Sequence, residues 1–186
     1  MLRLVLLGGP GSGKGTQAEL LARRTGVRHI STGELLRAEV AAGSELGGQV
    51  VGHLDSGELV PDELLLDLTL PLVRAAAGSG AGYVLDGFPR SVNQARLLDA
   101  GTEPAAAVCR VVLLEVPRDE LVARLRNRAA EQNRADDADA VIVRRLCVFE
   151  TEAGPLVDYY LESGRLVVLD AAAPPEVVAE RLEQAL

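Results

Sequence analysis

A glycine-rich stretch near the start of the chain restricts the possible folds more than any other feature. Residues 8–17 read GGPGSGKGTQ and directly follow the apolar run at 2–7. Glycine is the costliest residue to order on folding, so five glycines within eight positions indicate that a ligand approaches bare backbone. The spacing from Gly8 to Gly13 and Lys14 matches G-x-x-x-x-G-K, in which backbone N–H groups surround a phosphate. We therefore predict a strand, a phosphate-binding loop and a helix, in this order.

A phosphate-binding loop accounts for these glycines better than a dinucleotide-binding site or a simple turn does. The dinucleotide-binding pattern G-x-G-x-x-G cannot be laid on them, and a purely structural turn leaves the order of strand, loop, lysine and helix unexplained. The loop departs from the general motif at one position, because Gly15 stands where a Ser or Thr usually ligates Mg²⁺, and Thr16 follows it. Lys14 is the only lysine among the 19 basic residues, in the one loop where a compact ammonium suits a terminal phosphate.

Composition predicts one soluble domain that acts on a small molecule. The 186 residues suit a single domain, and the formal net charge of −8 argues against binding to nucleic acid polymers, which requires many cations. Neither a signal peptide nor an apolar run of about 20 residues is present, and the two cysteines form no C-x-x-C pair. We expect a cytoplasmic protein with no membrane or nucleic-acid partner.

Short apolar runs alternate with helical patterns along the whole chain. This alternation predicts an α/β fold in which helices cover both faces of a parallel sheet. The predicted strands lie at 2–7, 29–31, 82–85, 110–116 and 165–169. The predicted helices lie at 13–25, 32–42, 44–55, 61–77, 91–100, 118–129, 138–163 and 174–185.

Two segments do not fit a compact α/β core. Residues 31–60 form small polar helices broken by glycines, and residues 127–137 (NRAAEQNRADD) are almost wholly polar. We predict that both are mobile insertions. The core would then consist of 1–30, 61–126 and 138–186.

Several charged residues are candidates for chemistry. Asp86 ends a predicted strand, where it can hold Mg²⁺ beside the loop, although an aspartate before glycine is also common in turns. Arg90, four residues later, is a candidate phosphate clamp. Arg124 and Arg128 share a helix face, where they repel each other unless an anion lies across them. For each arginine alone, a solvated surface position is the alternative.

The remaining candidates are ambiguous from spacing. Arg134 lies in the polar segment, and Arg145 has apolar residues one helical turn to either side, but so has Arg144. His29 and His53 are isolated and are expected to be structural, so the sequence shows no catalytic dyad. Phosphoryl transfer to an ionised phosphate needs no general base; it needs positioning and positive charge.

Five motifs together resemble the adenylate kinase family, in order and over nearly the whole chain. They are GGPGSGKGTQ at 8–17, HISTGELLR at 29–37, GELVPD at 57–62, DGFPRSVNQ at 86–94 and RADD at 134–137. The resemblance is to the short-lid type, which implies no zinc. It implies a P-loop NTPase-type fold with a five-stranded parallel sheet, a monomer, and reversible Mg²⁺-dependent phosphoryl transfer from ATP to AMP.

The resemblance also assigns roles, with 31–60 as the flap that binds the monophosphate and 127–137 as the lid. The residues it places on ATP are Gly11, Ser12, Gly13, Lys14, Gly15, Thr16, Arg124, Arg128 and Ala173. The residues it places on AMP are Thr32, Arg37, Glu58, Leu59, Val60, Gly87, Phe88, Pro89, Arg90, Gln94, Arg134 and Arg145. Those it places around the transferring group are Lys14, Arg90, Arg128, Arg134 and Arg145. It also implies that Asp86 holds Mg²⁺ through water and that the Phe88–Pro89 peptide bond is cis.

Two other functions share part of this pattern. UMP/CMP kinases resemble the chain in most motifs, but they tend to have other residues at the positions of Thr32 and Gln94, which favour adenine here. A non-catalytic ATP-binding switch needs the loop but not Asp86 and the arginines. A GTPase is disfavoured because its N-K-x-D motif would need a second lysine.

Overall fold

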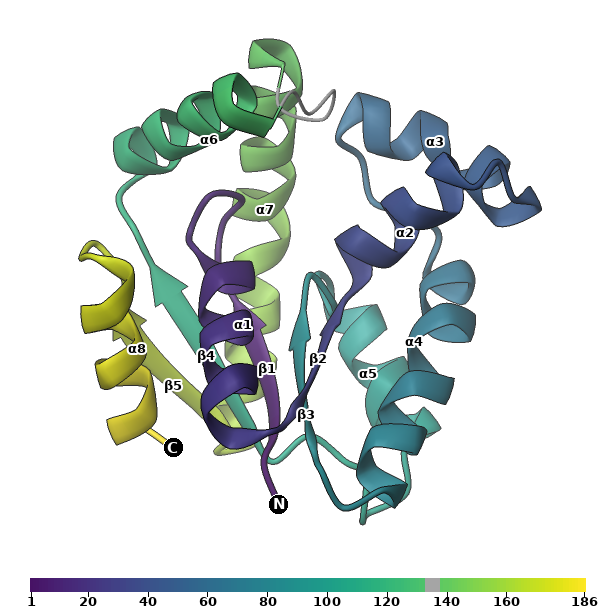
Figure 1. Cartoon of the computed structure of the whole chain (residues 1–186), viewed down its shortest axis with the longest axis vertical. Coiled ribbons are helices and arrows are strands. Elements are labelled where there is room, and N and C mark those ends of the chain that lie inside the picture. Colours follow the sequence, from purple (N-terminus) through teal and green to yellow (C-terminus); the bar gives the residue numbers. More distant parts are fainter. Residues whose placement is uncertain (133–137) are drawn as a thin grey trace.

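The apolar runs form five parallel strands in a single sheet. The computed structural model describes residues 1–132 and 138–186. The strands are β1 (Arg3–Leu7), β2 (Arg28–Ser31), β3 (Tyr83–Asp86), β4 (Arg110–Glu115) and β5 (Leu166–Asp170). Their order in the sheet is β2-β3-β1-β4-β5, with β1 in the centre (Figure 1). The predicted five-stranded parallel sheet is therefore confirmed.

The central strand shows why the sheet needs helices on both faces. Side chains alternate between the two faces of a strand. Accordingly Val5 and Leu7 belong to one buried apolar cluster, whereas Leu4 and Leu6 belong to the other. A strand with apolar side chains on both faces must be covered on both sides.

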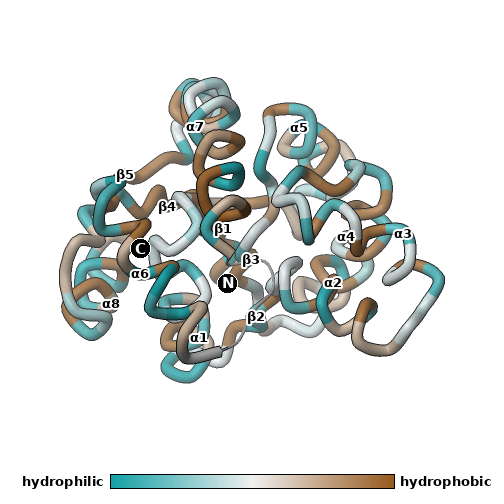
Figure 2. The backbone as a smooth tube through the Cα atoms, turned by 90° about the horizontal axis from the view of Figure 1, so that it is seen from above, coloured by the Kyte–Doolittle hydropathy of each residue, from teal (hydrophilic) through white to brown (hydrophobic). Residues whose placement is uncertain are grey.

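Eight helices surround the sheet in the described part of the chain. They are α1 (Lys14–Thr25), α2 (Thr32–Ala41), α3 (Glu45–Ser56), α4 (Asp62–Gly78), α5 (Val92–Gly101), α6 (Arg118–Gln132), α7 (Asp139–Glu162) and α8 (Pro175–Gln184). Seen from above, α1 and α8 lie on one side of the strands and α5 and α7 on the other (Figure 2). Both α2 and α3 pack against each other beyond the carboxyl ends of the strands, and α6 stands beside the upper part of α7 (Figure 1).

The observed helices agree closely with the predicted ranges, with one difference. Helix α6 continues to Gln132 instead of ending at residue 129, so the predicted lid begins as helix. The prediction ended the helix where the sequence becomes polar. Residues 129–132 are Ala, Ala, Glu and Gln, which are all good helix formers, so the helix continues through them. None of the helices in the described residues combines the length and hydrophobicity that a membrane span requires.

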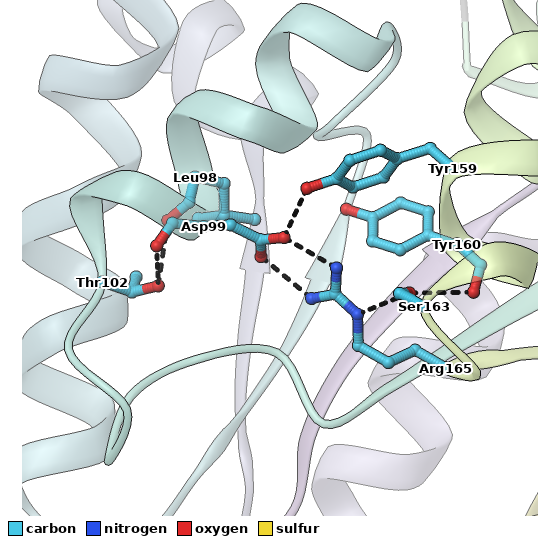
Figure 3. A network of polar contacts seen from close by, with 7 residues as sticks. All are labelled: Leu98, Asp99, Thr102, Tyr159, Tyr160, Ser163 and Arg165. Carbon is cyan, nitrogen blue, oxygen red and sulfur yellow. Dashed lines mark hydrogen bonds and ion pairs between the residues drawn. The ribbon is translucent and has the colours of Figure 1, made fainter.

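A polar network fastens the carboxyl-terminal part of the chain to α5 (Figure 3). The Arg165 guanidinium donates to both Asp99 carboxylate oxygens, at 2.9 and 2.7 Å, and the Tyr159 hydroxyl donates to Oδ2 at 2.7 Å. The guanidinium also lies 5.0 Å from the ring centre of Tyr160. Burial by itself raises the pKa of Asp99, but the hydrogen bonds from Arg165 and Tyr159 outweigh burial and lower it. The ionised carboxylate therefore ties α5 to α7 and to the start of β5.

We predict that Asp99→Asn lowers the free energy of unfolding by about 2 kcal/mol at pH 7, because a charge-assisted hydrogen-bond pair is lost. The pKa of Asp99 is lower in the folded state than its unfolded-state value of 3.8. The resulting stabilisation is therefore fully present above pH 3.8 and is lost as the pH falls through the folded-state pKa. Urea denaturation should therefore give the same difference between wild type and variant at pH 7 and pH 5, and a smaller one at pH 3.5. Asp158→Asn, an exposed aspartate on α7, is the control and should change little. Equal stability of the Asp99 variant and wild type at pH 7 would contradict a stabilising network.

Candidate active site

The glycine-rich loop connects the end of β1 to the start of α1. Gly13 caps the helix with φ 92°, a left-handed conformation that favours glycine, and a Cβ there would meet nothing within 4 Å. Backbone geometry, and not lack of space, therefore requires this glycine. The first N–H groups of a helix have no partner within the helix, and they carry a partial positive charge. This geometry is suited to the anion site that the sequence predicts.

The Lys14 side chain folds back over this loop. Its ammonium donates to the carbonyl oxygens of Gly8 at 2.8 Å and Gly9 at 2.9 Å. Burial of the ammonium lowers the pKa of Lys14 to about 8; Asp86 opposes this shift, and Arg90, among other arginines, adds to it. A bound phosphate would favour the protonated form of such a lysine.

Asp86 lies beside the loop because of strand pairing. In the sheet it is opposite Leu6 of β1 and opposite Ser31 of β2. The Ser31 hydroxyl lies 3.4 Å from Asp86 Oδ2, and a Cβ on Gly15 would lie 3.4 Å from the same oxygen. Mg²⁺ is commonly held by one or two carboxylates, several waters and the substrate phosphates, and a single carboxylate next to a phosphate loop fits this pattern. Among the described residues, no group of three or more His, Cys, Asp or Glu side chains could hold a metal ion.

A cavity of about 780 Å³ opens above the carboxyl ends of the strands. This volume is typical of small-molecule sites. Five arginines from four different regions line it, together with Lys14, although the chain as a whole is acidic. They are Arg37, Arg90, Arg124, Arg128 and Arg145. The arrangement is suited to a ligand with several negative charges.

A smaller cavity of about 40 Å³ adjoins the first one on the side of α2 and α3. Of the residues predicted for AMP, it is lined by Thr32, Arg37, Glu58, Leu59, Val60, Gly87, Arg90 and Arg145. Both cavities share Arg37, Arg90 and Arg145. The two spaces therefore meet at a set of cations.

The predicted ATP residues gather around the larger cavity. Those that line it are Gly11, Ser12, Gly13, Lys14, Gly15, Thr16, Arg124, Arg128 and Ala173. Arg124 pairs with Glu120 and donates to the Ala171 carbonyl at 3.1 Å, so it contacts the loop that carries Ala173. The structure thus brings this predicted set together.

Three of the described residues predicted for AMP do not line the smaller cavity. The Phe88 side chain is fully buried in the core, and the Phe88–Pro89 peptide bond is cis, as predicted. Gln94 is fully buried behind Arg90 and lines neither cavity. Arg134 lies outside the described residues. Pro89 lines the larger cavity.

The structure separates arginines of α6 and α7 that lie close together in the sequence, among them Arg144 and Arg145, which spacing left ambiguous. Arg145 lines both cavities, whereas Arg144 pairs with Glu58 at 2.9 Å on the exposed side of α7. Similarly, Arg128 lines the larger cavity, whereas Arg126 pairs with Asp139 at 2.9 Å.

Several cavity residues have no counterpart in the sequence prediction. Gln17 is buried, and its amide donates to the Pro175 carbonyl at 2.9 Å. A polar residue at a core-facing position next to Ala18 was the available signal. His29 and His53, which the sequence analysis expected to be structural, line the larger and the smaller cavity respectively. The α7 residues that also line the larger cavity are Val148, Phe149, Glu152, Ala153, Leu156 and Val157. The apolar ones among them were missed because an apolar helix face predicts core equally well.

Comparisons with known proteins agree with this geometry. A family model described as adenylate kinase matches residues 6–165. The adenylate kinase of Bacteroides fragilis is 40% identical, covering 100% of this chain and 98% of the relative. That of Stenotrophomonas maltophilia is 43% identical over 100% of this chain and 99% of the relative. Adenylate kinase 1 of Synechocystis is 46% identical over 97% of this chain and 95% of the relative.

The family match therefore covers most of the chain, and these relatives are matched over nearly their whole length. The same chain brings a phosphate loop, an acidic strand end and a group of arginines to one cavity. The chain belongs to the adenylate kinase family.

Proposed function

We propose that the protein transfers the terminal phosphoryl group of ATP to AMP, reversibly and with Mg²⁺, to give two molecules of ADP. The observation that carries the proposal is the meeting of two cavities at Arg37, Arg90 and Arg145. One cavity contains the phosphate loop, so the phosphates of two nucleotides can converge on the shared arginines. The family match supports this reaction over the two alternatives, a UMP/CMP kinase and a non-catalytic switch.

The larger cavity would bind ATP. In this proposal the backbone of residues 11–16 surrounds the phosphates, and Lys14 and Arg128 neutralise them. Arg124 and the backbone at Ala173 lie against the adenine. The lining of the cavity by all of these residues supports the assignment.

The smaller cavity would bind AMP. Thr32, Arg37 and the segment 58–60 would contact it from the flap side, and residues 87–90 from the core side, with Gln94 reading the base. Arg90 and Arg145 would close on the transferring group, and Arg134 would join them from the lid. The lining residues of this cavity support the set apart from Phe88, Gln94, Pro89 and Arg134.

Asp86 would hold Mg²⁺ through water beside the ATP phosphates. When bound, the metal ion supplies positive charge to the phosphate oxygens during transfer. The residues of the chain would orient both nucleotides and exclude water, because phosphoryl transfer between phosphates needs no protein base.

We further propose two moving parts on the core: the flap at 31–60 and the lid at 127–137. Packing of α2 and α3 mainly against each other supports the flap. The flap also reaches α7, where a Cβ on Gly57 (φ 73°) would lie 2.8 Å from Arg145 Cγ. The lid rests on the sequence resemblance, since 133–137 lie outside the described residues. A monomeric state and a cytoplasmic location stay predictions.

The proposed function is tested by supplying ATP with one acceptor at a time. We expect rapid ADP formation with AMP, and kcat/KM values at least about a hundredfold lower with CMP, UMP and GMP, because a site that hydrogen-bonds one base leaves buried groups unpaired with another. The measurement is product quantification by chromatography, with ATP alone as the control for hydrolysis. A preference for CMP or UMP, or ATP binding without turnover, would contradict the proposal.

The pKa of Lys14 gives a second prediction. Because this pKa is about 8, the free enzyme is largely deprotonated at Lys14 at pH 8.5, and bound phosphates should restore the proton. ATP binding should then take up about half a proton or more at pH 8.5 and much less at pH 7. Calorimetry in two buffers with different ionisation enthalpies measures this uptake.

Lys14→Arg is the matched control, since a guanidinium stays protonated throughout this range. It should show no uptake at pH 8.5 at saturating ATP. The same uptake in both proteins would assign the titration to another group and remove the role given to Lys14.

A further inference from the structure

The side-chain amide of Gln94 is held from both ends. Its oxygen accepts from the Arg90 backbone N–H at 2.7 Å, and its nitrogen donates to Asp62 Oδ1 at 2.8 Å. A backbone N–H can only donate and a carboxylate can only accept, so these two partners fix which end of the amide is oxygen. The amide nitrogen keeps a second N–H, and the amide oxygen keeps a second lone pair, for a further hydrogen bond.

This orientation matters for reading a purine base. On its pairing edge adenine offers an acceptor at N1 and a donor at the 6-amino group, whereas hypoxanthine and guanine offer a donor at N1 and an acceptor at O6. A glutamine amide that rotates by half a turn can match either pattern. A glutamine therefore selects adenine only if something prevents that rotation.

We propose that Asp62 is a positioning residue that locks the Gln94 amide in its adenine-reading orientation. Rotation would bring the amide NH₂ against the Arg90 N–H and the amide oxygen against the Asp62 carboxylate. Both contacts would be repulsive and partly buried, with Gln94 itself fully buried. The inference rests on the proposed function, in which Gln94 reads the base of AMP.

Asp62 is itself held in place. Its second carboxylate oxygen, Oδ2, accepts from the Asn93 amide at 2.5 Å, so both oxygens are used. Asp62 is the first residue of α4, where a negative charge is favoured, and it lies two residues after the end of the proposed flap. The lock therefore connects the end of the flap, α5 and the loop that carries Arg90.

The lock lies directly behind the wall of the smaller cavity. Arg90 and Val60 line that cavity, and Gln94 bonds to the backbone of Arg90. At about 40 Å³ the cavity has room for about one water, so a purine enters only when the wall moves. The hydrogen bonds with Arg90 and Asp62 keep the amide oriented before the base arrives. Binding therefore does not have to include the free-energy cost of reorienting it.

The test compares AMP with inosine monophosphate, which carries hypoxanthine, as acceptors for ATP. In Asp62→Asn one amide oxygen must serve two donors, Gln94 and Asn93, and the amide nitrogen can donate to a rotated Gln94. We expect the ratio of kcat/KM for AMP to that for inosine monophosphate to fall about tenfold or more. The KM for ATP should stay unchanged. Asp67→Asn, an exposed aspartate on the same helix, is the control and should keep the wild-type ratio.

An equal loss of activity toward both acceptors, with the ratio unchanged, would show a purely structural role for Asp62 and overturn the proposal. Asp62→Ala removes the acceptor without adding a donor and gives a second variant, also expected to lower the ratio, if Asp62→Asn does not fold. Gln94→Leu distinguishes a failure of the lock from a failure of the base-reading role of Gln94. A collapsed ratio in Gln94→Leu with a normal ratio in both Asp62 variants rejects the lock alone. A normal ratio in Gln94→Leu rejects the base-reading role, and no turnover of AMP by wild type rejects the proposed function.

Discussion

The parallel pairing of β3 with both β1 and β2 is the constraint on which the site depends. It sets Asp86 opposite Leu6 on one side and Ser31 on the other, between the phosphate loop and the segment that begins α2. A one-residue slip in register would exchange the side chains of the two buried clusters. Because the apolar core opposes that slip, the groups at the strand ends are held as rigidly as the sheet.

Rigidity is needed because the site gathers positive charge at close range. Burial lowers the pKa of Lys14, and neighbouring arginines such as Arg90 and Arg145 lower it further, so the cations destabilise one another. Anionic phosphates bound there would reverse that penalty. A cluster that is held in place by the fold does not have to reorganise when the charge of the transferring group changes, and this favours transfer.

Local patterns predicted most of the fold, and long-range contacts account for what they could not predict. The strand runs, the helix periodicity and the glycine loop are local patterns. The position of Asp86 beside the loop follows from its place at a strand end. The bond of Gln94 to Asp62 and that of Gln17 to Pro175 join residues far apart in sequence, so spacing carries no trace of them. Likewise Glu58, from outside the helix, pairs with Arg144 and distinguishes it from Arg145. The assigned roles of the site residues stay predictions.

In the proposed mechanism two nucleotides bind at once, and their phosphates meet at the shared arginines. A single compound with two adenosines joined through five phosphates tests it directly, by titration calorimetry against ATP and AMP alone. Simultaneous occupation predicts one compound per protein, bound at least about a hundredfold more tightly than either nucleotide, because linking makes the second contact intramolecular. Binding no tighter than that of ATP, or two compounds per protein, would contradict the claim.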